Sequence, residues 1–251
     1  MLAPELLVLL VCTGTVGGAV AGIGGPGGPP VLIVLNLVLA LSPTVAAATA
    51  SSIFIVATAA ATTLYYHSDG IDWRLAAVVG GPALAGTLLG ARVAPGLPVE
   101  VFEVILGGAL VFAAGGIVYT QGDPDRLAGD WADRTVRAAV AAGSLVIGIV
   151  AGITGIGGPA LTVPLMILLG IAPITAIGAG VASGVLITTS TTLGHVVQGN
   201  SPALVPLVVI GGPYVAAQVI GWKYVHAVSG RAVSYTIAAV AVAGSVAIVV
   251  M

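Results

Sequence analysis

Long apolar runs separated by short polar or glycine-rich breaks cover almost the whole chain. In the first half the runs span residues 3–22, 30–41, 45–66, 74–93 and 99–119; in the second half they span residues 136–153, 160–171, 174–197, 203–222 and 232–250. Eight of these runs have about 18–24 residues, enough for an α-helix to cross roughly 30 Å of hydrocarbon. The runs at 30–41 and 160–171 are shorter, and we predict that they do not cross.

The composition indicates that these helices lie in lipid. Hydrophobic residues make up 58% of the chain and charged residues 6%, against about 25% charged residues in ordinary soluble domains. So few charges cannot cover a surface that faces water. We therefore predict an all-α polytopic membrane protein surrounded by the lipid bilayer. The net charge of −2 gives no reason to expect a nucleic-acid partner.

The two halves of the chain repeat one another. The first half carries Gly-Gly-Pro at residues 80–82 and the second half carries it at 211–213, and Pro43 has its counterpart in Pro173. The glycine-rich breaks also match, at a separation of about 130 residues. We predict a first transmembrane repeat over residues 1–119, a polar cytoplasmic linker over 120–135 and a second transmembrane repeat over 136–251.

The few basic residues predict how the repeats are oriented. If each glycine break makes a hairpin that returns to its own side, each half crosses an odd number of times and the halves are inverted. With the N-terminus outside, every Lys and Arg except Arg92 then lies on the cytoplasmic side, as the positive-inside rule requires. If instead the first run of each half spans fully and the short run is re-entrant, the halves are parallel, and the seven basic residues divide at best four against three between the two sides. We predict inverted five-segment repeats with both termini outside, in the plasma membrane.

The glycine breaks are the strongest candidates for a binding site. Helix breaks at matching positions of two repeats point to the binding site of a transporter, and non-helical backbone is tolerated in a membrane where it lines a cavity. Glycine exposes backbone N–H groups at a helix start, where the partial charge is positive. We predict that the two hairpins meet near the midplane and bind a small anion there. The predicted substrate-binding residues in the breaks are Gly25, Gly27, Gly28, Pro29, Gly155, Gly157, Gly158 and Pro159.

Polar side chains near the breaks are candidates for completing the site. Ser51, Ser52 and Ser183 lie in the long helices that follow the breaks, and Asn36 lies in the short run 30–41. These four could bind the anion, or they could form the interhelical hydrogen bonds that small polar residues make in membranes.

Four ionisable residues at helix ends are candidates for gating or coupling. His67 and His195 end the helices 45–66 and 174–197; they could couple transport to protons, or they could simply interact with the helix dipole. Arg92 and Lys223 are repeat-related. They could attract an anion into a vestibule, or they could extend to the lipid headgroups.

Other chemistries find no support in the sequence. There is no P-loop motif, and the apolar runs contain no cluster of acidic residues or histidines of the kind that a membrane protease or a metal site needs. The single Cys12 excludes an intramolecular disulfide. We predict that the protein is not an enzyme and holds neither a cofactor nor a metal.

The order of these motifs resembles the sulfite exporter TauE/SafE family of membrane transporters. The resemblance rests on "GIGGPGGPPVLIVLNLVLALSPTVAAATASS" in the first half and "AGITGIGGPALTVPLMILLGIAPITAIGAGVASG" in the second. The resemblance covers about residues 14–250 without the linker 120–135. In the family pattern each half has a G-x-G-G segment and then a proline-bearing apolar stretch. Pro29 and Pro159 depart from it, standing where the family has a further glycine.

The resemblance implies a secondary transporter that exports a small sulfur-containing anion, such as sulfite or a short organosulfonate. The residues alone indicate a small oxyanion substrate and do not select sulfur over a carboxylate. An anion channel and a subunit that only supports a partner are the alternatives. The G-x-x-x-G patterns Gly86–Gly90 and Gly17–Ala21 would permit a homodimer, and they would serve equally well for packing within one chain.

Overall fold

The computed structural model describes residues 3–23, 27–68, 70–120, 131 and 133–223, with the side chains of 116–120 left aside. The long helices of the first half are α1 (Pro4–Gly22), α3 (Pro43–His67), α4 (Trp73–Val93) and α5 (Val99–Thr120). Those of the second half are α6 (Arg134–Thr154), α8 (Pro173–Val197) and α9 (Leu204–Lys223). Two short helices complete the set, α2 (Gly28–Ile33) with the π-helical turn η1 (Val34–Val38), and α7 (Gly158–Leu168). The 3-10 helix η2 (Ala94–Gly96) follows α4.

These helices confirm the all-α class predicted from the sequence. Each helix begins within about two residues of the predicted apolar run, because local signals mark the starts. Pro43 and Pro173 stand in the first turn of α3 and α8, where a missing N–H costs nothing. Asp72 and Asp133 cap α4 and α6 by accepting backbone N–H groups. The predicted run 232–250 lies outside the described residues.

The described part of the chain contains six helices long and apolar enough to cross a membrane. They are α1, α3, α4, α6, α8 and α9. The helices α2 with η1 and α7 are apolar and shorter. A multi-pass membrane protein follows from these lengths and compositions.

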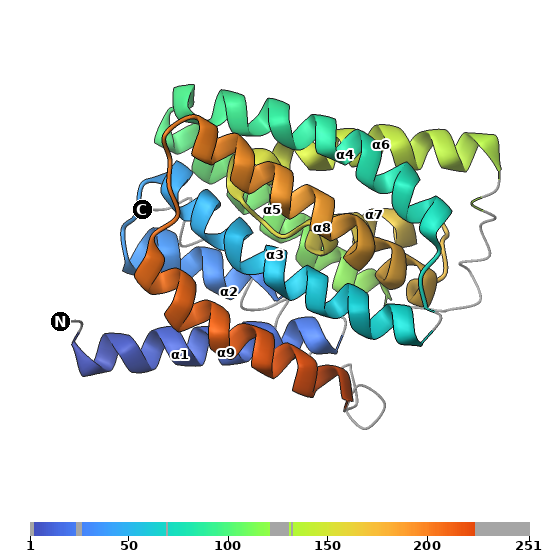
Figure 1. Cartoon of the computed structure of the whole chain (residues 1–251). Helices are drawn as coiled ribbons and strands as arrows, with labels where there is room; N and C mark the ends of the chain where they lie inside the picture. Colours follow the sequence, from blue (N-terminus) through green and yellow to red (C-terminus); the bar gives the residue numbers. More distant parts are fainter. Residues whose placement is uncertain (1–2, 24–26, 69, 121–130, 132, 224–251) are drawn as a thin grey trace.

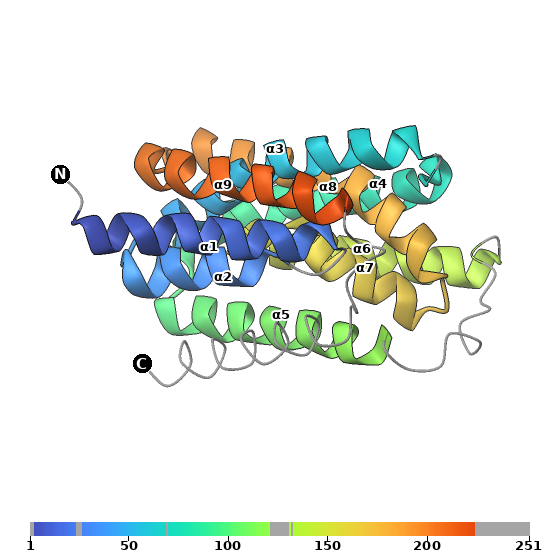
Figure 2. The ribbon, with the colours of Figure 1, turned by 90° about the horizontal axis from the view of Figure 1, so that it is seen from below.

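Three helix pairs build most of the bundle. In Figure 1, α1 lies beside α9 along one side, α4 lies beside α6 along the opposite side, and α3 and α8 pass between them. Seen from below in Figure 2, α5 lies across the face that α2 and α7 also approach. Each outer pair joins the first long helix of one half to the third long helix of the other half, so the two halves are interlocked.

The pair α1–α9 is held together by close backbone contact at glycines. A Cβ placed on Gly18 would lie 2.7 Å from the carbonyl carbon of Tyr214, and a Cβ on Gly22 would collide with the backbone of Gln218. Both partners advance by one helical turn together, so α1 and α9 run parallel. Small residues at this spacing let helices approach closely in lipid, where van der Waals packing replaces the hydrophobic effect.

The pair α4–α6 uses the corresponding residues. A Cβ on Gly148 would lie 2.8 Å from the Cα of Ala83, and a Cβ on Gly152 would lie 2.8 Å from the Cα of Thr87. Gly148 and Gly152 follow the α1 glycines of the first repeat by 130 residues, and Ala83 and Thr87 precede their α9 counterparts by 131. The same contact therefore occurs twice, with the two halves exchanged.

The central pair brings repeat-related residues together. Thr58 of α3 and Thr188 of α8 are separated by 130 residues in the chain, and their Oγ1 atoms lie 3.5 Å apart. Earlier on α3, Ser51 accepts a hydrogen bond of 2.9 Å from Thr192, which lies later on α8. The helices therefore cross antiparallel, as the colours of Figure 1 also show.

A second interaction mirrors the first across this crossing. Thr62 of α3 donates to the carbonyl of Val181 on α8 at 3.1 Å, and these residues are the repeat counterparts of Thr192 and Ser51. Two equivalent helices that cross antiparallel with matched contacts are related by an approximate two-fold axis perpendicular to the helices. That axis passes near Thr58 and Thr188.

Candidate functional site

The starts of the two short helices meet in the middle of the bundle. A Cβ placed on Gly28, the first residue of α2, would lie 3.7 Å from the amide nitrogen of Gly157, the residue before α7. Both glycines also contact Phe54, which stands near the middle of α3. The sequence predicted that the glycine breaks approach one another. The contact between Gly28 and Gly157 is the point at which they do.

The turn between α6 and α7 extends past this meeting point toward the start of α3. Gly155 ends α6 with φ +72°, a left-handed conformation that favours glycine, and a Cβ there would collide with the backbone of Ala47. Ala47 precedes Phe54 by seven residues on α3, about 10 Å along a helix. Thr154 accepts the N–H of Ile156 at 3.3 Å and stabilises the turn. The chain therefore doubles back before α7 begins at the centre.

The helix starts carry partial charge without charged side chains. Gly27 and Gly157 precede α2 and α7, and neither helix has a side-chain cap. Gly27, Gly28, Gly157 and Gly158 are all buried. Backbone N–H groups at a buried helix start form the positive end of the dipole, which suits a small anion. Because proline has no N–H, Gly28 is the one donor among the first three residues of α2. In α7 the N–H of Ala160 already donates to the carbonyl of Gly157 at 3.0 Å, which leaves Gly158 as the donor of that start. Gly25, the remaining predicted glycine of the first break, lies outside the described residues.

The prolines beside these glycines differ in their surroundings. Pro29 is buried and Pro159 is half-buried. A Cβ placed on Gly184 of α8 would lie 2.9 Å from Cδ of Pro159 and 3.0 Å from Cγ2 of Thr58. The ring of Pro159 therefore packs close to the central crossing, where α7 joins α8.

The serines predicted for the site use their hydroxyl hydrogens within the helices. Ser51 donates to the carbonyl of Ala47 at 2.7 Å, Ser52 donates to that of Ala48 at 2.7 Å, and Ser183 donates to Gly180 at 3.1 Å. Because these hydrogens are engaged, the hydroxyls would have to rotate before they could donate to an anion. In this conformation Ser51 and Ser52 contribute to the joint between α3 and α8.

Among the described residues, the side chain of Asn36 makes no hydrogen bond to the meeting point of α2 and α7. It lies in the π-helical turn η1 and donates to the carbonyl of Leu32, one turn earlier, at 2.8 Å. Asn36 is half-buried. The hydrogen bond stabilises the end of the short helix.

Comparison with known families agrees with this architecture. A family model described as sulfite exporter TauE/SafE matches residues 5–248. The chain belongs to the TauE/SafE family. The resemblance inferred from the motifs is thus confirmed, and because the family consists of transporters, the chain is a membrane transporter and its predicted lack of enzyme activity fits. No curated protein and no solved structure matches the chain.

The two described histidines of this TauE/SafE chain have different surroundings. His67 is exposed at the end of α3. His195 is 0% exposed, and its Nε2 lies 2.9 Å from the carbonyl oxygen of Gly152 on α6. A carbonyl only accepts, so Nε2 carries the proton. The Nδ1 of His195 is buried and has no hydrogen-bond partner among the described residues.

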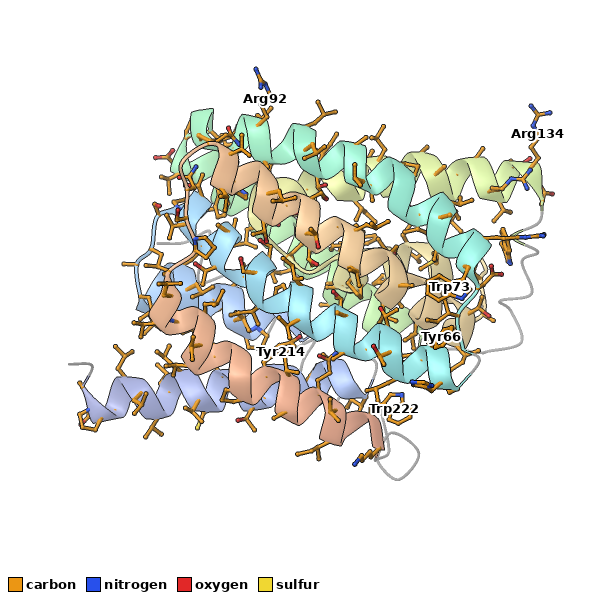
Figure 3. All side chains as sticks on the ribbon, in the orientation of Figure 1. Tyr66, Trp73, Arg92, Arg134, Tyr214 and Trp222 are labelled. Carbon is orange, nitrogen blue, oxygen red and sulfur yellow. The ribbon has the colours of Figure 1, made fainter. Side chains whose placement is uncertain are left out.

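The two repeat-related cations lie away from the centre. Arg92 and Lys223 are exposed, and Figure 3 shows Arg92 pointing away from the bundle. Lys223 ends α9 next to Trp222, at the opposite end of the molecule from Arg92. Neither side chain contributes to the meeting point of α2 and α7, although both stand where they could act on an approaching ion.

Two aromatic residues at the centre were missed by sequence reasoning. Phe54 and Tyr214 are each 3% exposed, and their ring centroids lie 5.6 Å apart at an interplanar angle of 57°. A Cβ on Gly27 would lie 2.6 Å from Oη of Tyr214. The sequence of an apolar helix does not indicate whether an aromatic residue faces the lipid or the centre of the bundle. Comparison of the repeats could have found them, because the counterparts at 184 and 83 are glycine and alanine.

The described residues contain no group of three or more His, Cys, Asp or Glu side chains that could hold a metal ion. Within that part of the chain, the polar groups at the meeting point of α2 and α7 are backbone amides and the hydroxyls nearby. This set of donors can bind an anion and offers a cation no carboxylate.

Proposed function

We propose that the protein is a secondary transporter that exports a small sulfur-containing anion, such as sulfite or a short organosulfonate. The anion binds where the starts of α2 and α7 meet, beside Gly27, Gly28, Gly157 and Gly158, and Pro29 and Pro159 shape the two helix starts. Gly25 and Gly155 belong to the breaks that lead to these starts, and Gly155 itself lies against Ala47, away from the meeting point. Ser51, Ser52 and Ser183 join them after their hydroxyls rotate, and Asn36 supports the α2 side. Family membership supports export and sulfur; the uncapped helix starts support an anion.

The observation that carries the proposal is the contact between Gly28 and Gly157. The starts of α2 and α7, the positive ends of their dipoles, then lie next to each other. Neither glycine has a side chain that would keep a small ligand away from the backbone. An oxyanion can accept N–H groups from both starts at once, and its charge is balanced without a fixed cation.

Alternating access follows from the inverted relation that we assign to the two halves. The antiparallel crossing at Thr58 and Thr188 and the exchanged glycine contacts support this assignment. Inverted repeats give a transporter two conformations of comparable energy, each open to one side of the membrane. We assign the end with α4's first residues and Lys223 to the cytoplasm, which leaves Arg92 and the first residues of α1 outside the plasma membrane. That both termini lie outside stays part of the proposal and rests on the positive-inside rule.

Thermal unfolding of the detergent-purified protein in a panel of anions tests the binding part of the proposal. The panel contains sulfite, sulfate, sulfoacetate, acetate and chloride at equal ionic strength. An anion present at about 100 times its dissociation constant stabilises the folded state by roughly 2.7 kcal/mol. We expect a shift with sulfite or sulfoacetate and none with chloride.

Each outcome of the panel has a defined meaning. A shift with acetate alone would keep the anion site and reject the sulfur substrate. A shift with chloride as large as that with sulfite would favour an anion channel. A variant Gly157→Ala that keeps the wild-type shift would reject the site itself, because the added methyl group fills the space between Gly157 and the ring of Phe54, next to the proposed ligand.

A further inference from the structure

Phe54 lies between the two helix starts. A Cβ on Gly157 would lie 3.2 Å from Cδ2 of Phe54, and a Cβ on Gly28 would lie 3.4 Å from its Cζ. One edge of the ring therefore touches both glycines, with Gly157 near its base and Gly28 near its tip. Any ligand that contacts both glycines must share their surroundings with this ring.

Tyr214 supports the ring from α9. The two rings pack at a tilt, with centroids 5.6 Å apart, an arrangement that aromatic pairs favour. The backbone of Tyr214 is pressed against Gly18 of α1, so Tyr214 is fixed by the α1–α9 pair. Phe54 is the member of the pair that faces the contact between Gly28 and Gly157.

The aromatic pair is a departure from the repeat. The counterpart of Phe54 is Gly184, and the counterpart of Tyr214 is Ala83. The second half builds the same helix contacts with these small residues, since Ala83 packs on Gly148 as Tyr214 packs on Gly18. Close packing of the helices therefore does not require aromatic rings at 54 and 214, and their presence at the meeting point of the breaks calls for another role.

We propose that Phe54 is the gate and the size-selecting residue of the transport path. This inference rests on the proposed function, because it concerns which anions reach the site between Gly28 and Gly157. The ring closes the space beside the two glycines when no substrate is bound. It turns aside for a small oxyanion and leaves no room for a longer chain attached to the sulfonate, and Tyr214 limits how far it can turn.

The inference is tested by competition in proteoliposomes. Counterflow of radioactive sulfite is measured against methanesulfonate, ethanesulfonate, butanesulfonate and hexanesulfonate in wild type and in Phe54→Ala. The wild type should be inhibited by the short sulfonates and progressively less by the long ones. In Phe54→Ala we expect inhibition by the long sulfonates to strengthen roughly tenfold or more relative to methanesulfonate, since one methylene in a restricted pocket changes discrimination by about that factor.

Phe102→Ala is the matched control. Phe102 lies on α5, and its exposed fraction is 2%, against 3% for Phe54. None of its atoms is among those nearest to a Cβ built on Gly28 or Gly157. The two substitutions remove the same buried ring, so they should weaken folding to a similar degree. Phe102→Ala should keep the wild-type chain-length profile. Phe54→Leu serves if Phe54→Ala does not fold, because leucine fills the core without the ring edge.

The outcomes separate the gate from the function. An unchanged chain-length profile in Phe54→Leu or Phe54→Ala, with sulfite counterflow intact, would overturn the gate and leave the proposed function in place. An equal change of the profile in Phe102→Ala would also overturn it, since general loosening would then be the cause. Absence of any sulfite counterflow in the wild type would remove both proposals.

Discussion

Replacing the glycines of the two outer helix pairs by alanine should destabilise the protein at repeat-related positions to a similar degree. Gly18→Ala places a methyl group 2.7 Å from the carbonyl carbon of Tyr214, and Gly148→Ala places one 2.8 Å from Cα of Ala83. Carbon atoms pack best at about 3.5–4.0 Å, so each pair of helices must separate by about 1 Å. The atoms in the way are backbone and cannot rotate aside.

The magnitude follows from two opposing effects. Overpacking of this kind costs about 1–3 kcal/mol, while alanine in place of glycine favours a helix by about 1 kcal/mol. We expect a net loss of up to about 2 kcal/mol in the free energy of unfolding for each variant. Gly81 and Gly212 are the matched controls, since they are repeat-related too and a Cβ on either meets nothing within 4 Å. Each control glycine precedes a proline, Pro82 or Pro213, which crowds the preceding residue in a helix. Gly81→Ala and Gly212→Ala should therefore cost equally little, and less than the two buried substitutions.

The stability of all four variants is measured by unfolding in mixed micelles that contain an increasing fraction of denaturing detergent. The midpoints of Gly18→Ala and Gly148→Ala should fall further than those of the controls, with equal slopes throughout. If Gly18→Ala behaves as Gly81→Ala does, the close α1–α9 contact is refuted. If only one of the two buried positions is sensitive, the exchange of equivalent contacts between the halves is refuted.

Three further predictions concern the site and its supports. Gly157→Ala should weaken the affinity for sulfite about tenfold with little loss of stability, because its methyl group meets only the side chain of Phe54, at 3.2 Å. Gly27→Ala should lower the unfolding temperature of the protein without ligand, because its methyl group collides with the backbone of Gly17. Thermal unfolding with and without sulfite separates the two effects. His195→Gln should flatten the pH dependence of transport between about pH 5 and 8 if the buried His195 takes up a coupling proton, while the exposed His67→Gln should leave the profile unchanged; equal profiles in all three proteins would reject coupling through His195. The hydrogen bond from the Thr135 N–H lowers the pKa of Asp133, so this cap stabilises α6 above that pKa and the stabilisation is lost as the pH falls through it; Asp133→Asn should remove this acid-side dependence of the unfolding temperature, and an unaltered dependence would count against the cap.

The helices and the family could be predicted from the sequence because their signals are local. Pro43 and Pro173 mark helix starts, and matching glycines lie 130 or 131 residues apart, which predicts the repeat. The sequence also predicted that the two breaks approach one another, and Gly28 and Gly157 lie close together in the structure.

The remaining features depend on tertiary contacts that carry no local signal. His67 and His195 both end long helices, yet one is exposed and the other buried against Gly152. Ser51 and Ser52 were predicted from the sequence to bind the anion, whereas in the structure their hydroxyls donate hydrogen bonds to carbonyls of their own helix. Phe54 lies in an apolar run, and only the three-dimensional arrangement brings it between the glycines.

The same limit applies to the glycine pattern Gly86–Gly90. The sequence left open whether it serves a homodimer or the packing of one chain. In the structure, Cβ atoms on these two glycines would collide with the backbone of Leu145 and Ile149 on α6, so the pattern packs α4 within the chain. A homodimer stays a prediction that would need another surface.

Counterflow in proteoliposomes tests the central claim most directly. Vesicles loaded with unlabelled sulfite are diluted into radioactive sulfite, and the transient accumulation of label is followed for wild type and for Gly157→Ala. The account predicts saturable accumulation above equilibrium in the wild type, loss of accumulation with chloride in place of internal sulfite, and strong reduction in Gly157→Ala. Passive equilibration without accumulation would show a channel, and full accumulation in Gly157→Ala would contradict a binding site at the starts of α2 and α7.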